Sequence, residues 1–288
     1  MTKKKLAKKF TNLKTLLDNK IHKKLSQIFF AGVFLFLGFS CQSRSEKLYT
    51  QAYEKINQNL FADAIELLES SAALEKENLK KTKALFEAAR LLRFEIHNYD
   101  AALTILRKIV LESEDAKLRL LSQESIAEIY FDHRQDYPAA LNELLILEPL
   151  LQESKKKENI RLKIAQAQRF SGNNAAALEY VDVALKSSDA LRNNFLKLKA
   201  QIFQSQQKYD EALKIYENIF LKTPDYFIHE NLFSATSNIH EEKKDYKTAI
   251  EYLEKNANQI ADKNYLELRI KKLKEKQIAK PFSKGVRK

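Results

Sequence analysis

Glycine is scarce in this chain. Four glycines occur in 288 residues, and two of them, Gly32 and Gly38, lie in one apolar segment near the N-terminus. Loops that hold phosphate groups and folds that bind dinucleotides need several closely spaced glycines, because the backbone must turn tightly and approach the ligand. The sequence therefore excludes both kinds of nucleotide site.

Cysteine and histidine are also sparse. The single cysteine, Cys41, cannot form an internal disulfide. The histidines His97, His133, His229 and His240 are scattered without the spacing of metal ligands, and no His-Glu-x-x-His motif occurs. Carboxylates are plentiful but spread over predicted helix faces, as ordinary solvated charges are. The sequence offers no catalytic residue, no metal site and no cofactor site, and we expect a protein that is not an enzyme.

The positive charge is concentrated at the two ends of the chain. The formal net charge is +12, but residues 1–24 hold nine lysines and one aspartate, and residues 271–288 hold eight lysines or arginines and one glutamate. The remainder is mildly acidic. A nucleic-acid-binding protein needs a continuous basic surface that follows the phosphates, and this distribution does not supply one. We expect no nucleic-acid partner, and no small-molecule substrate is evident.

A repeated apolar pattern fills most of the chain. An aromatic residue, or Asn174 in its place, is followed at +3 by Ala, at +4 by an aliphatic residue and at +7 by another large apolar residue. Six such patterns recur at intervals of 35 to 38 residues, which is the sequence signature of stacked helix pairs. The six repeated alanines are Ala64, Ala102, Ala140, Ala177, Ala212 and Ala249.

The spacing within each pattern predicts a helix. In the repeat that begins at Tyr209, apolar residues at +3, +4, +7, +10 and +11 share one helical face. Alanine suits the point where two helices approach most closely, because a larger side chain would force them apart. A short polar residue that can cap the helix, or accept a left-handed conformation, directly precedes four of the patterns: Asn98, Asp136, Asn173 and Asp245.

These features resemble the tetratricopeptide repeat (TPR) family. The fifth repeat matches the family's spacing best, and Gly172 stands at the family's turn glycine, although tryptophan is absent throughout. The resemblance implies an all-α, right-handed superhelical solenoid of about six TPR-like helix pairs over residues 41–270. The basic end of a capping helix and a flexible tail are expected at 271–288. The matching residues are Leu196, Ala200, Phe203, Tyr209, Ala212, Tyr216 and Pro224.

The resemblance also implies a concave groove, lined by the first helix of each pair, that binds protein or peptide partners. Amide side chains, which pair well with an extended peptide backbone, are frequent at the transferred groove positions. The family's carboxylate clamp is not reproduced, because Gln201 replaces its asparagine and Ala235 falls where another is needed. Ordinary solvated helix faces are the alternative interpretation. The groove candidates are Asn159, Gln166, Arg169, Asn194, Lys197, Gln201, Asn231 and Asn238.

The N-terminal repeats differ from the later ones at the equivalent positions. They place Tyr49, Tyr53, Leu91 and Phe94 there. This more apolar set predicts either a protein interface or packing between helices.

The N-terminus has the pattern of a secretory signal peptide. The lysine-rich residues 1–24 precede an apolar stretch from Ile28 to Phe39, which is 12 residues long and too short to span a membrane. The segment from Leu37 to Cys41 then resembles a lipobox, in the relaxed form found in spirochaete lipoproteins. This resemblance implies a signal peptide at 1–40, a lipid-modified Cys41 and a lipoprotein on the inner or outer membrane of a bacterial cell envelope.

Two alternatives for the function stay open at this point. An uncleaved helix from Leu25 to Cys41 would make the protein an inner-membrane-anchored TPR adaptor. In architecture, a repeat array behind a lipid-bearing cysteine also resembles the TPR lipoprotein of the outer-membrane β-barrel assembly machine, so a component of outer-membrane protein assembly is a narrower possibility.

Overall fold

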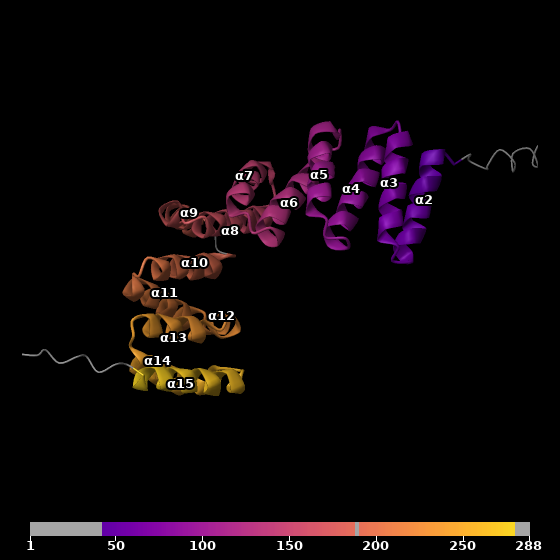
Figure 1. Ribbon diagram of the computed structural model, residues 1–288. Coiled ribbons are helices and arrows are strands. Elements are labelled where there is room, and N and C mark those ends of the chain that lie inside the picture. Colours follow the sequence, from indigo (N-terminus) through magenta and orange to yellow (C-terminus); the bar gives the residue numbers. More distant parts are fainter. Residues whose placement is uncertain (1–41, 188–189, 280–288) are drawn as a thin grey trace, which may run out of the picture. The chain divides into compact units, whose positions relative to one another are not determined.

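A computed structural model describes residues 42–187 and 190–279, which are helical almost throughout and contain no strand (Figure 1). The proposed signal peptide, Cys41 and the end of the tail lie outside the described residues. The helices are α2 (Arg44–Asn57), α3 (Phe61–Leu74), α4 (Asn78–Phe94), α5 (Tyr99–Glu112), α6 (Ala116–Glu128), α7 (Tyr137–Leu147), α8 (Ser154–Phe170), α9 (Asn174–Ser187), α10 (Arg192–Ser205), α11 (Tyr209–Lys222), α12 (Pro224–His229), α13 (Leu232–Glu242), α14 (Tyr246–Lys255) and α15 (Lys263–Ile278).

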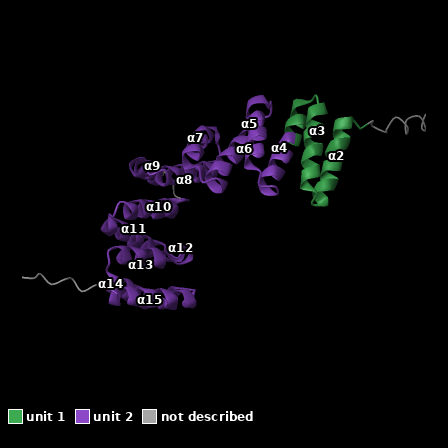
Figure 2. Ribbon diagram, in the orientation of Figure 1, with its two compact units in different colours: residues 1–84 green, residues 85–288 purple. Residues whose placement is uncertain are grey.

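The chain forms two compact units, which divide inside α4 (Figure 2). The described part of the first unit, residues 42–84, holds α2, α3 and the first turns of α4. The second unit holds the rest of α4 and the helices up to α15. Within each unit, helices that follow one another in the sequence pack together, so every helix buries its apolar face mainly against its neighbours in the chain.

The repeated alanines lie at the centre of the packing. All six are completely buried, with an exposed fraction of 0%. The large apolar residue four positions after each alanine is buried on the same face, as Tyr216 and Leu253 illustrate. The predicted place of the alanines on the packed face of each helix is confirmed, because none of them reaches solvent.

The turn within each helix pair uses one backbone conformation. The residue two positions before each pattern has a positive φ, between 53° and 82°. The left-handed residue is therefore one position earlier than the sequence predicted. The predicted capping role is confirmed at Asn98, Asp136 and Asp245, whose side chains accept hydrogen bonds from backbone N–H groups in the first turn of the next helix. The left-handed residues in these turns are Asn59, His97, Gln135, Gly172, Gln207 and Lys244.

The repeats are longer than the family's period because several elements are extended. Both α4 and α8 have 17 residues, and α6 continues into a π-helical turn, Ile129–His133, which the sequence pattern did not predict. A short helix, α12, also precedes α13 and begins at Pro224, where a missing backbone N–H costs nothing.

The last helix closes the array as predicted. Leu266 and Leu273 of α15 are buried, while Lys271 and Lys272 are exposed. A repeat array needs such a helix to shield its terminal apolar face. Within the described residues, no helix is both long enough and apolar enough to cross a membrane.

Candidate partner-binding surface

All of the predicted groove residues lie in the second unit, and all except Asn231 lie on the first helices of the last three pairs. Gln166 and Arg169 are three residues apart on α8 and share one face, because residues at i and i+3 are neighbours on a helix. The three candidates on α10, at intervals of three and four residues, share a face in the same way. We call the residues Gln166, Arg169, Asn194, Lys197, Gln201, Asn231 and Asn238 the polar face.

One residue of the polar face links two repeats. The ammonium group of Lys197 on α10 lies 2.5 Å from a carboxylate oxygen of Glu230, which follows α12. This hydrogen bond and the positive charge of Lys197 hold the pKa of Glu230 below its ordinary value. The charge of Lys197 is therefore already balanced inside the chain. Glu230 could not be predicted from the sequence, since the two paired residues are 33 positions apart and meet only in the folded chain.

A second residue of the polar face, Asn238, also makes a contact between two helices. The Asn238 side-chain oxygen accepts a hydrogen bond of 2.6 Å from Arg269 on α15. Arg269 also pairs with Glu241, which lies one helical turn beyond Asn238 and receives Lys276 as well. The two cations hold the pKa of Glu241 below its ordinary value even though partial burial acts to raise it. This cluster joins α13 to α15 and borders an open pocket of about 230 Å³.

Asn231 and Asn159 have local roles. Asn231 does not lie on α13 but directly precedes it, with a left-handed φ of 49°, and its side-chain oxygen accepts a hydrogen bond from Ser234. The Asn159 amide donates to the Lys155 carbonyl one turn earlier in α8. Both asparagines are exposed, and each already makes one hydrogen bond to a residue three or four positions away in the chain.

Four residues of the polar face keep their hydrogen-bonding groups available. Gln166, Arg169, Asn194 and Gln201 are half-buried, and none of them makes a side-chain hydrogen bond to another residue in the described part of the chain. They come from the adjacent helices α8 and α10, which pack on each other. The structure thus concentrates available amides and one guanidinium on neighbouring first helices.

The apolar candidates in the N-terminal repeats separate into packing and surface residues. Leu91 is 1% exposed and belongs to the core, which settles its role as packing between helices. Phe94 is 48% exposed and lies under the Arg93 guanidinium, at 4.4 Å from the ring centre. Arg93 in turn pairs with Glu128 on α6 at 2.8 Å. Phe94, Arg93 and Glu128 line a pocket of about 280 Å³ in the second unit.

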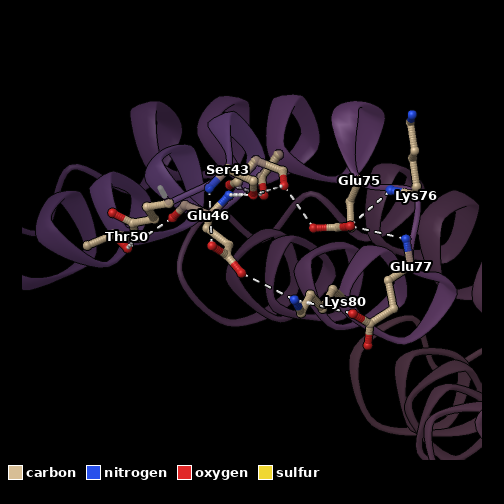
Figure 3. A network of polar contacts seen from close by, with 10 residues as sticks. Ser43, Glu46, Thr50, Glu75, Lys76, Glu77 and Lys80 are labelled. Atoms are coloured by element: carbon tan, nitrogen blue, oxygen red, sulfur yellow. Dashed lines mark hydrogen bonds and ion pairs between the residues drawn. The ribbon is translucent and has the colours of Figure 1, made fainter. Parts of the chain in front are cut away.

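The first unit contains a pocket of about 400 Å³ beside the start of α2. Figure 3 shows the polar contacts among the residues around it. Ser43 caps α2 by accepting from the Glu46 backbone N–H, and the Glu46 carboxylate accepts from the Ser43 backbone N–H in return. The Ser45 hydroxyl donates to Glu75 at 2.8 Å. Lys80 at the start of α4 then bridges Glu46 and Glu77, each at 3.2 Å.

The charges of this pocket satisfy one another. The Glu77 backbone N–H and the Ser45 hydroxyl lower the pKa of Glu75, while Glu46 and Glu77 raise the pKa of Lys80. Its polar groups therefore hold the start of α2 against the segment that joins α3 and α4. The sequence does contain the pattern of this helix start, because a serine followed three residues later by a glutamate is typical of a capping box. Our sequence analysis did not predict it.

The described residues do not assemble a metal-binding cluster. No group of three or more His, Cys, Asp or Glu side chains in residues 42–187 and 190–279 could hold a metal ion. The histidines are dispersed, with His133 stacked on Tyr99 at 4.8 Å and His240 half-buried beside Tyr252.

Comparison with solved structures identifies the fold. The chain superposes on a tetratricopeptide repeat protein from Parabacteroides merdae with a TM-score of 0.57 and 17% identity, covering 84% of this chain and 95% of that one. It also superposes on a STAND signal-transduction ATPase with a tetratricopeptide repeat sensor from Pyrococcus horikoshii, with a TM-score of 0.55 and 17% identity, covering 81% of this chain and 40% of that one.

No family model matches the sequence, and no curated protein does. The fold comparison nevertheless agrees with the repeat seen in the sequence and the packing seen in the structure. The chain has the all-α fold of tetratricopeptide repeat proteins.

Proposed function

We propose that this protein is a non-catalytic scaffold that binds an extended segment of a protein partner through its polar face. The observation that carries the proposal is the set of four half-buried, unpartnered polar side chains on the adjacent helices α8 and α10. Amides offer both a donor and an acceptor, as the peptide backbone does, so they suit an extended chain better than they suit a small charged metabolite.

Site-specific photo-crosslinking in native cells tests this proposal. A photo-reactive phenylalanine analogue at Gln201 on the polar face should capture a partner protein, and the same analogue at Glu217, which is exposed on α11, should not. Far-UV circular dichroism of both variants checks that the helices remain intact. Equal capture at the two positions, or no capture at Gln201, would contradict the use of this face.

The location of the scaffold is a second part of the proposal. The lysine-rich N-terminus, the 12-residue apolar stretch and Cys41 support a lipoprotein that is tethered in a bacterial cell envelope. Tethering would hold the repeat array near the membrane and raise its effective concentration for partners there. Cys41 and the residues before it carry this part of the proposal by sequence alone.

Intact mass of the N-terminal peptide, from the membrane fraction of native cells, tests the tether. We expect a chain that begins at acylated Cys41, and we expect Cys41→Ala to abolish both acylation and membrane association. A chain that keeps residues 1–40 without acylation would instead favour an anchored adaptor. A chain without lipid and without membrane association would contradict both.

A further inference from the structure

Arg169 differs from the other partly buried arginines of the structure. Its Nε atom is enclosed and has no hydrogen-bond partner, as is also true of Arg269, but Arg269 pairs with a carboxylate through its other nitrogen atoms. In the described part of the chain, the Arg169 side chain makes neither an ion pair nor a hydrogen bond. The other arginines with restricted exposure each pair with a carboxylate or donate to a backbone carbonyl: Arg90, Arg93, Arg119, Arg161 and Arg269.

The surroundings of Arg169 contain further unpartnered polar atoms. The hydroxyl groups of Tyr216 and Tyr226 are both enclosed without a hydrogen bond, and Tyr216 is 1% exposed. The positive charge of Arg169 acts against the burial that raises the pKa of Tyr216. The guanidinium carbon lies 5.0 Å from the centre of the Phe170 ring. The guanidinium thus packs against an aromatic ring and not against a carboxylate.

The positive charge of Arg169 has no negatively charged partner among the described residues. Glu230 neutralises the positive charge of Lys197, so Lys197 does not compete with Arg169 for a bound anion. No carboxylate of the described residues pairs with Arg169 itself, and burial accordingly lowers its pKa. A half-buried cation without a counter-charge is unfavourable, and it becomes favourable when an anion reaches its exposed side.

We infer that Arg169 is the anion-binding point of the polar face and that it takes a single carboxylate from an acidic partner peptide. This inference rests on the proposed function, since the peptide is the segment that the polar face would bind. The planar guanidinium matches the geometry of a carboxylate, and one unbalanced positive charge matches one carboxylate charge. Gln166 on the same helix and Gln201 on α10 are then placed to receive the backbone of that peptide.

The carboxylate can come from an acidic side chain or from the C-terminus of the partner. The chemistry at Arg169 is the same for both sources. An immobilised array of ten-residue peptides separates them, if each peptide is presented with Glu or Gln at one internal position and with a free or amidated C-terminus.

The binding experiment uses the full-length protein and two variants. Arg169→Gln removes the cation from the polar face, and Arg192→Gln is the control, because Arg192 is exposed and donates to the Leu185 carbonyl. We expect the wild type and the control to prefer carboxylate-bearing peptides about tenfold or more, as one charge-assisted contact implies, and Arg169→Gln to lose the preference. A preference that persists in Arg169→Gln, or that is absent in the wild type, would overturn the inference.

A measurement without peptides distinguishes failure of the inference from failure of the proposed function. The Nε–Hε signal of Arg169 in nitrogen-15 NMR, assigned by its loss in Arg169→Gln, should shift saturably with N-acetylglutamate amide and stay fixed with N-acetylglutamine amide. If peptides bind but this signal does not respond, the scaffold proposal stands and the carboxylate site is wrong. If the signal responds but no peptide binds, the carboxylate site stands and the peptide-binding function is wrong.

Discussion

The left-handed turns allow the cost of one backbone conformation to be measured without a change in packing. Gly172 has a φ of 82°, and a Cβ added there would meet no atom within 4 Å. Gly172→Ala therefore changes the conformational energy of the turn and leaves the contacts between helices intact. A left-handed conformation costs an ordinary residue about 1–2 kcal/mol, and the lower entropy of the unfolded chain returns about 0.4–1 kcal/mol. The expected net loss is about 1 kcal/mol.

The reverse substitution provides the matched test. Gln207 occupies the same turn position with a φ of 60°, so Gln207→Gly should leave stability unchanged or raise it by up to about 1 kcal/mol. Urea unfolding of the full-length chain, followed by far-UV circular dichroism, measures both variants. A loss near zero for Gly172→Ala, or a loss of stability for Gln207→Gly, would refute the argument that backbone conformation alone sets the cost at these turns.

Three further predictions concern side chains of the second unit. Tyr216→Phe removes a buried hydroxyl that has no partner and should be neutral or slightly stabilising in urea unfolding, whereas Tyr180→Phe removes a hydroxyl that donates at 2.7 Å and should cost about 1 kcal/mol. Burial lowers the pKa of His240, so this histidine binds a proton more readily in the unfolded chain than in the folded one. The free energy of unfolding should therefore fall as the pH drops below about 6.5. His240→Gln should reduce this dependence in urea unfolding measured between neutral and mildly acidic pH. Glu230→Gln leaves the charge of Lys197 unbalanced and should tighten binding of acidic array peptides several-fold, and an unchanged affinity would show that Lys197 lies outside the binding surface.

The repeat and its core could be predicted from the sequence because they depend on local spacing. The burial of Ala102 and Ala212 follows from their position in a period that each helix imposes on its own residues. The caps at Asn98 and Asp245 follow from side-chain chemistry next to a helix start. These features need no knowledge of how distant segments meet.

The left-handed residues were harder to predict because most of them are not glycine. Gln207 and Lys244 give no sign of a positive φ by residue type. Their constant position, two residues before each pattern, is the signal that the sequence does contain. It becomes readable only after the repeats have been aligned.

The candidate surface was predicted only in part because polar contacts between repeats depend on packing. The alignment placed Lys197 and Asn238 on the polar face, but their partners Glu230 and Arg269 lie 33 and 31 residues further along the chain. Which residues meet across that distance is set by the rotation and register of packed helices. Arg169 was nominated by alignment as one of eight residues, and its distinctive lack of a partner became visible only in the structure.

The shared geometry of the turns also bears on how such a chain can change in length. Each of the six turns leads into its second helix through a left-handed residue at the same position. A segment copied from one turn to the next would therefore arrive with compatible junctions at both ends. Gene duplication could extend the array by whole repeats without a new kind of loop, and deletion could shorten it in the same increments. The number of repeats can therefore evolve separately from the residues of the polar face.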